Sequence, residues 1–210
     1  MLSSTSLLLT LLPLALTTPI IPRTNDTPLR FGAIAARSAS PIHLQSINAN
    51  GQAFWIGKDT ATYCPIESCP AGNLTVFSAA NGGASLDVVV PGGQSIYVAP
   101  NGKLSYTIAH SASMPAGSAV KTFTATIPAT GNGGGVPLGS FSFKGLGGEG
   151  FLACPSHKVD SEEGPFPYQV FVNVPAMSDK DAPSGSKADC LGFSPIIVEY
   201  KGDAAAWQYT

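Results

Sequence analysis

Residues 94–108 read QSIYVAPNGKLSYTI, two apolar stretches on either side of the dipeptide Asn101-Gly102. Both stretches contain the β-branched and aromatic residues that are enriched in strands. An Asn-Gly pair between two such stretches is a strong hairpin signal, because both residues accept the positive φ of a tight turn. The segment therefore predicts an antiparallel hairpin with strands at 94–99 and 104–108.

Short apolar runs separated by turn residues continue through the chain from Arg30 onward. Asn50-Gly51 predicts a second hairpin, and Gly92-Gly93 predicts a turn before the strand at 94. No stretch has sustained helical periodicity, and residues 204–207 would form one helical turn at most. The chain is therefore predicted to be all-β, with further strands at 31–36, 42–47, 52–57, 74–79, 86–90, 122–127, 141–143, 151–154, 168–174 and 196–200.

The composition agrees with a turn-rich β protein of single-domain size. Among 210 residues, 23 are Gly and 18 are Pro, only 11% are charged, and the net charge is −2. A high apolar fraction with so little charge argues against disorder. No basic cluster is present, so nucleic acid and anionic membrane surfaces are not expected partners. Residues 203–210 carry no hydrophobic tail, so no lipid anchor is expected either.

Three segments that begin with Gln suggest an internal repeat. QAFWI starts at Gln52, QSIYV at Gln94 and QVFV at Gln169, and apolar segments stand before and after each of them. Three copies of a four-strand unit would make a β-trefoil, a closed barrel with three-fold symmetry. The trefoil is the preferred topology. A β-sandwich is the alternative, because short strands resemble one another in any all-β fold.

The N-terminus has the pattern of a secretory leader. Residues 6–16 read SLLLTLLPLAL, an apolar run too short to span a bilayer, and small residues follow it. Residues 1–17 are predicted to be a signal peptide and residues 18–30 a linker or short pro-segment. A single domain is predicted over residues 31–210. The chain is therefore expected outside the cell.

The four cysteines agree with secretion, because an even number in an extracellular chain favours two disulfides. Three pairings are open, of which Cys64–Cys69 with Cys154–Cys190 is preferred, giving a disulfide-stapled domain. The cysteine spacing lacks a CxxC pair and a neighbouring His, so no zinc site is expected.

Two tripeptides match the N-glycosylation signal: Asn25-Asp-Thr and Asn73-Leu-Thr. Asn25 lies in the predicted linker. Asn73 follows the short loop between Cys64 and Cys69, in a Gly- and Pro-rich stretch that is expected to be exposed. Both are predicted glycosylation sites.

Several motifs resemble those of a known group of proteins. They are RSASPIHLQSINANGQAFWIG (37–57), TYCP (62–65), CPAGNLTVF (69–77) and GGQSIYVAPNGKLSYTIAHS (92–111), followed by GFLACP and PYQVFV. Together they are similar to fungal secreted IgE-binding proteins and to the phialide cell-wall protein family. The resemblance implies a secreted protein of a filamentous fungus that is found in the wall or the medium and is recognised by IgE. It supplies no catalytic residues.

Neither the histidines nor the carboxylates form a catalytic pattern. A nucleophilic triad needs an activated Ser, and no G-x-S-x-G is present near the three histidines, His43, His110 and His157. A glycosidase needs two carboxylates on opposite sides of a sugar, whereas Asp160, Glu162 and Glu163 are neighbours in one polar loop. We therefore expect a protein without enzymatic activity, cofactor or metal.

Contact with carbohydrate is the function that the residue types favour, because aromatic rings cover the apolar faces of sugars and planar polar groups bind their hydroxyls. The candidate contacts are Trp207, Tyr106 and Asp87, whereas Trp55 and Tyr97 are expected in the core. The expected partner is cell-wall polysaccharide. The alternative is an effector or inhibitor that binds a host protein through the loop at 111–117 or at 160–168, and a hydrolase is the least favoured reading.

Overall fold

The computed structural model describes residues 27–69, 72–129, 135–160, 162 and 165–210. The predicted signal peptide and Asn25 lie outside these residues. The elements within the described ranges are strands and two short 3-10 helices, so the all-β class is confirmed. No helix in this part of the chain combines the length and apolar character that a membrane crossing requires. The strands are β1 (Leu29–Ala36), β2 (Ile47–Asn50), β3 (Ala53–Ile56), β4 (Thr62–Tyr63), β5 (Phe77–Ala80), β6 (Gly83–Leu86), β7 (Gln94–Val98), β8 (Leu104–Tyr106), β9 (Phe123–Thr126), β10 (Leu138–Gly145), β11 (Gly148–Glu149), β12 (Phe151–Pro155), β13 (Tyr168–Val172), β14 (Leu191–Glu199) and β15 (Gln208–Tyr209), and the helices are η2 (Asp179–Asp181) and η3 (Lys187–Asp189).

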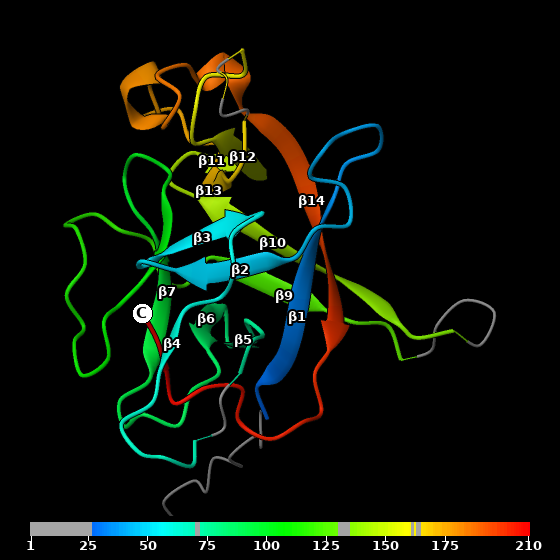
Figure 1. The fold of residues 1–210 in the computed structure, drawn as a ribbon, viewed down its shortest axis with the longest axis vertical. Coiled ribbons are helices and arrows are strands. Elements are labelled where there is room, and N and C mark those ends of the chain that lie inside the picture. Colours follow the sequence, from blue (N-terminus) through cyan, green and yellow to red (C-terminus); the bar gives the residue numbers. More distant parts are fainter. Residues whose placement is uncertain (1–26, 70–71, 130–134, 161, 163–164) are drawn as a thin grey trace, which may run out of the picture.

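The main sheet closes into a barrel (Figure 1). Its strands follow the order β1-β5-β6-β7-β8-β3-β13-β12-β14, and β14 returns to pair with β1. The closing pair is antiparallel and continuous from Phe31↔Glu199 to Ala36↔Ser194. Strand β2 pairs with β3, and β9 and β11 pair with β10, which itself pairs with β14. A closed ring removes the exposed sheet edges along which chains aggregate.

Aromatic side chains fill the barrel. In β1 the buried residues alternate, so that Phe31, Ala33 and Ala35 point inward. The Phe77 ring lies 5.5 Å from that of Phe31 and 5.2 Å from that of Phe54, measured between centroids. These separations are in the preferred range for aromatic pairs, which adds to the stability that burial itself supplies.

Both predicted Asn-Gly hairpins are confirmed. Strands β7 and β8 pair from Ile96↔Tyr106 to Val98↔Leu104 around the Asn101-Gly102 turn. Gly102 has φ +87°, and a β-carbon there would collide with the Val172 carbonyl. Both the backbone conformation and the lack of space therefore require glycine at this position. At the other hairpin, Gly51 and Gln52 both have positive φ, as the two central residues of a type I′ turn must.

Two local predictions are wrong. Residues 42–44 form a turn instead of a strand, with His43 N–H donating to the Ser40 carbonyl. Ser46 makes only an isolated bridge to Ile34, and Ile47 is the one residue of this range that enters β2. Residues 87–90 do not form a strand of the barrel, because β6 ends at Leu86. Residues 204–207 form no helical turn, which agrees with the prediction of one turn at most; they run along residues 88–90, where Val89 N–H donates to the Ala206 carbonyl. The turn at 42–44 is held by local hydrogen bonds, since His43 and Gln45 donate to residues three positions earlier, whereas the segment at 87–90 donates to partners that are more distant in sequence.

Neither the trefoil nor the sandwich is confirmed, since the sheet is one closed nine-strand ring. A trefoil would place its three repeats a third of the barrel apart, but the three Gln-led segments lie together in the order β7-β8-β3-β13. Their glutamines also differ in role. Gln52 is a turn residue, Gln94 is an inward buried residue and Gln169 is a strand residue opposite Trp55. The similarity reflects strand composition and not a structural repeat.

The disulfides have the preferred pairing. Cys154 in β12 joins Cys190, which directly precedes β14, and Cys64 joins Cys69 beyond β4. The first of these bridges links the two strands that run beside each other at Phe151↔Phe193. Strand β1 begins two residues before the strand predicted at 31–36, and Leu29 and Arg30 pair with β5.

Residues 200–210, which we call the C-terminal strap, cross one end of the barrel (red in Figure 1). Arg30 holds the first part of the strap, donating to the carbonyls of Gly202 and Asp203 at 2.7 and 2.8 Å. The same guanidinium donates to both carboxylate oxygens of Asp87, at 3.0 and 2.6 Å, and lies over the Tyr200 ring. The Asp87 carboxylate also accepts from Ala205 N–H at 3.0 Å. The bond to Asp87 raises the pKa of Arg30.

Inside the barrel end, Gln94 and Tyr209 hold the last part of the strap. Gln94 is 1% exposed, and its amide oxygen accepts from Tyr209 N–H while its amide nitrogen donates to the Tyr209 carbonyl. The Tyr209 hydroxyl donates to Leu74 O and accepts from Val76 N–H. Tyr106 donates from its hydroxyl to Thr210 O at 3.0 Å. Every polar group that the strap buries here therefore has a partner, which removes the usual cost of burial.

Asp87→Asn should loosen the strap. The substitution removes the carboxylate that pairs with Arg30 and weakens the acceptor for Ala205 N–H, at an expected cost of about 1–3 kcal/mol in the free energy of unfolding. Urea unfolding measures this cost, and limited proteolysis should cleave the variant first within the strap. Asp160→Asn, in an exposed loop, is the control. Equal stability and equal cleavage of the two variants would contradict the assigned role of Asp87.

The protein should lose stability in alkali. Burial raises the pKa of Tyr106 to about 12 and also raises that of Tyr209, because both phenols are shielded from water. Unfolded phenols ionise near pH 10, so the stabilisation is complete below about pH 10 and is lost as the pH rises toward about 12. For Tyr106 this amounts to roughly 2–3 kcal/mol.

Urea unfolding between pH 8 and pH 12 measures that loss. Tyr106→Phe should flatten the pH dependence of the free energy of unfolding, while Tyr63→Phe, at a half-exposed position, should leave it unchanged. An identical pH dependence in wild type and Tyr106→Phe would contradict the assignment.

Candidate functional site

The three residues predicted to contact glycan do not form one surface. Asp87 is engaged by Arg30 and the strap, and Tyr106 is 0% exposed inside the barrel. The prediction for Tyr106 therefore needs correction, because no ring face is open to a sugar. Trp207 is half-buried in the strap, and its carbonyl accepts from Val90 N–H. Of the three, only Trp207 presents an aromatic surface to solvent.

A pocket that the sequence did not indicate lies on the outer face of β7 and β8, and we call it the Tyr97 pocket. Its volume is about 400 Å³. Tyr97 is buried, as expected, and its 8% of exposed surface adds a small apolar area to that of two prolines, while side chains with amide, hydroxyl and ammonium groups supply hydrogen-bonding capacity. The lining residues are Gln52, Tyr97, Ala99, Pro100, Asn101, Lys103, Ser105 and Pro115.

Strand pairing positions these side chains. Tyr97 pairs with Ser105, and Ser105 pairs with Ala53, so the three residues form one row across β7, β8 and β3. Neighbours in such a row point to the same face of the sheet. The inward face of the same strands carries Ile96 and Phe54, which are fully buried. Tyr97 must therefore face out of the barrel, into the pocket.

Asn101 forms the rigid rim of the Tyr97 pocket. Its side-chain oxygen accepts from Lys103 N–H, and its side-chain nitrogen donates to Asp181 in η2. Asp181 also accepts from the hydroxyl and the N–H of Ser178. These bonds, chiefly the one from the Ser178 hydroxyl, lower the pKa of Asp181. The pocket is therefore tied to the loop that carries η2.

Trp55 lies on the same outer face of the sheet and is half-exposed, which corrects the expectation that it belongs to the core. It stands two residues along β3 from Ala53, the end of the Tyr97 row. From strand spacing and rise, the Cα atoms of Tyr97 and Trp55 lie roughly 12 Å apart. The Trp55 Nε1–H donates to Asn50 O, and the Lys58 ammonium lies 4.8 Å from the ring centroid.

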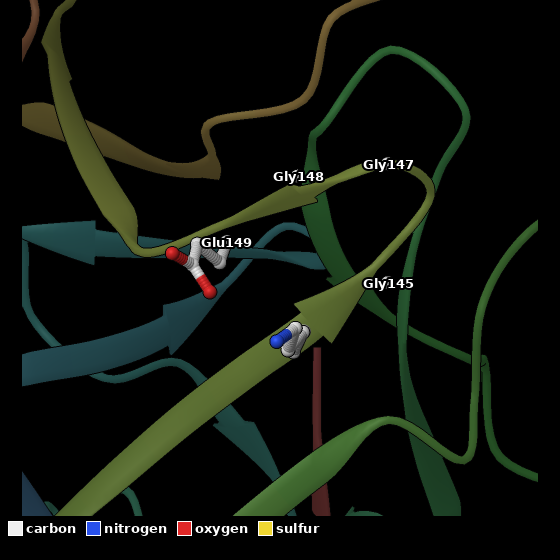
Figure 2. A pocket seen from close by; sticks show the side chains of 5 residues that line it. Gly145, Gly147, Gly148 and Glu149 are labelled. Atoms are coloured by element: carbon white, nitrogen blue, oxygen red, sulfur yellow. The ribbon is translucent and has the colours of Figure 1, made fainter.

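A second pocket, of about 470 Å³, follows the glycine-rich hairpin of β10 and β11 (Figure 2). Lys144 and Glu149 are directly opposed across the two strands, and Glu149 points from β11 toward β10. Three glycines complete the lining, and Gly148 has no room for a β-carbon because the Asn173 carbonyl lies against it. The glycines thus serve close packing, and this shallow surface lacks the aromatic component of the Tyr97 pocket.

The histidines and the acidic loop remain apart from both pockets. His43 accepts at Nδ1 from Arg37 N–H at 3.2 Å, and His110 is an exposed residue with positive φ. Asp160 and Glu162 are exposed, and Glu163 lies outside the described residues. Among the residues that are described, no group of three His, Cys, Asp or Glu side chains is placed to hold a metal ion.

Sequence reasoning missed the polar part of the Tyr97 pocket. Gln52 and Asn101 belong to two different hairpin turns, and they come together because β3 pairs with β8. The Asn-Gly turn signals mark both hairpins, but no local signal specifies which strands become neighbours. Tyr97 itself lies in an apolar run, where an inward and an outward aromatic residue look alike.

Comparison with known proteins agrees with the motifs quoted above. The family model of PhiA-like secreted proteins matches residues 31–210. An uncharacterised secreted protein of Arthroderma benhamiae is 40% identical over 207 residues, which cover 94% of this chain and 93% of that protein. No solved structure matches. These matches confirm both the family that the motifs indicated and the extracellular destination that the leader predicted. The chain therefore belongs to the family of PhiA-like secreted proteins.

Proposed function

We propose that this secreted protein binds a neutral cell-wall polysaccharide through the Tyr97 pocket and has no enzymatic activity of its own. The observation that carries the proposal is the composition of the pocket. An aromatic ring and two prolines lie beside the polar side chains of Gln52, Lys103 and Ser105, in an open volume of about 400 Å³. A sugar needs this combination, because its ring presents apolar C–H faces and a rim of hydroxyls.

The charged groups of the pocket lining favour binding over cleavage. The lining, as far as the chain is described, contains one cation and no carboxylate. Hydrolysis of a glycosidic bond needs two carboxyl groups on opposite sides of the sugar, so this lining favours binding over cleavage. The overall net charge of −2 supplies no strong field that would attract a charged polymer.

The position of Trp55 supports an extended ligand over a single sugar. Its Cα atom lies roughly 12 Å from that of Tyr97 on the same face of the sheet, so the Trp55 ring offers a second contact two or more sugar units away. A polymer that engages both rings gains from the second contact without a second cost of association.

A second candidate function is recognition by a host protein, including IgE. The loop at 111–117 carries Pro115 into the lining of the Tyr97 pocket and is exposed over most of its length. Its inner hydrogen bond, from the Ser118 hydroxyl to Pro115 O, keeps it in one shape. An exposed loop of defined shape beside a pocket suits a protein partner.

Retention on insoluble polysaccharide tests the proposal. The secreted protein is incubated with chitin, β-1,3-glucan, α-1,3-glucan and mannan, and the bound fraction is measured against concentration. We expect retention on at least one polymer. The double variant Gln52→Gly and Lys103→Ala should reduce affinity about tenfold, equivalent to about 1.4 kcal/mol. Glycine at position 52 removes the amide and suits the positive φ of that residue.

Gln45→Ala with Lys121→Ala is the matched control, because both residues are exposed and outside the pocket. Affinity equal to wild type in both double variants, or no retention of wild type on any polymer, would overturn the proposal. Capture of a host protein that is lost when the loop at 111–117 is shortened, without retention on polysaccharide, would establish the second candidate instead.

A further inference from the structure

An apolar groove lies on the outside of the barrel where β1 and β14 close the ring. Gly32 pairs with Val198 and Ile34 pairs with Ile196, so these four residues form the floor. The segment at 74–76 forms a wall, with Leu74 60% exposed. A β-carbon on Gly32 would meet no atom within 4 Å, so bare backbone deepens the groove there. The volume is about 170 Å³.

The glycosylation signal Asn73-Leu-Thr stands on the wall of this groove. Asn73 is exposed and directly precedes Leu74. Its neighbours are held firmly, since a β-carbon on Gly72 would collide with the Ala205 carbonyl. The Thr75 hydroxyl accepts from Ala49 N–H at 2.7 Å and shares a hydrogen bond with Thr60. The Tyr209 hydroxyl bonds to Leu74 O and to Val76 N–H. Any group attached to Asn73 therefore starts from a fixed position beside the groove.

We propose that Asn73 carries an N-linked glycan and that the first sugar residues of this glycan cover the groove between β1, β14 and Leu74. The core sugars of an N-glycan present the C–H face of the pyranose ring and the methyl of the N-acetyl group, both apolar. Leu74, the residue that follows the attachment point, lines the groove with its aliphatic side chain. Covering them removes apolar surface from water and stabilises the folded protein.

The burial of Thr75 sets the order of events. Thr75 is only 6% exposed, and its hydroxyl, which glycan transfer requires, is hydrogen-bonded in the fold. Transfer must therefore precede folding of this loop, as it does when a chain is modified during secretion. The proposal is independent of the Tyr97 pocket and of polysaccharide binding.

Expression in a eukaryotic secretory host, followed by peptide mass spectrometry, tests the attachment. We expect a glycan at Asn73 that is absent in Asn73→Gln and retained in Thr75→Ser, which keeps both the signal and the hydroxyl. Asn25→Gln serves as the matched control for losing a signal elsewhere. Secreted wild-type protein without any glycan at Asn73 would overturn the proposal.

Thermal unfolding and binding of a hydrophobic dye test the packing. Asn73→Gln should lower the unfolding midpoint by about 3 °C and raise dye fluorescence at least twofold. In the background of Gly32→Leu, which fills the groove, the same substitution should have less than half of either effect. Equal effects in both backgrounds would show that the glycan does not lie in the groove. Glycosylated wild type that forms a dimer dissociated by Gly32→Leu would show that a second copy occupies it, and would also overturn the proposal.

Discussion

The antiparallel pairing of β1 with β14 is the constraint on which the rest of the structure depends. It joins the first and the last long strand of the domain and closes the nine-strand ring. Without it, the sheet would have two open edges and the aromatic interior around Phe31 and Phe77 would lose one wall. The Cys154–Cys190 bridge lies where β14 begins and links it to β12, its second neighbour within the nine-strand ring. Closure and covalent linkage thus act on the same strand.

The C-terminal strap is a consequence of that closure. A closed barrel buries its walls but leaves its ends open, and here one end receives Tyr209 and the backbone around it. Gln94 matches both backbone groups of Tyr209, and Arg30 with Asp87 neutralises charge where the strap enters. Polar groups are tolerated inside because each has a partner.

The outer face separates into regions of different chemistry. Over β7, β8 and β3 it combines the Tyr97 ring with polar side chains, whereas over β1 and β14 it is mostly aliphatic, with Leu74 and Tyr200 beside it. The first suits a ligand from outside the molecule. The second suits a group attached to the molecule itself. This division follows from strand order, because it depends on which outward residues become neighbours around the ring.

The sequence by itself determined the all-β class, the two Asn-Gly hairpins, the preferred cysteine pairing and the secreted destination. Each of these rests on local signals: turn residues between apolar runs, an even number of cysteines and an N-terminal leader. Only the tertiary structure decided the ring of nine strands, the strap and the Tyr97 pocket. These depend on contacts between segments distant in sequence, such as Gln94 with Tyr209, and on which face of a strand points inward. Local composition does not encode either, because an aromatic residue such as Tyr106 or Trp55 has the same propensity for a strand whether it faces the core or the solvent.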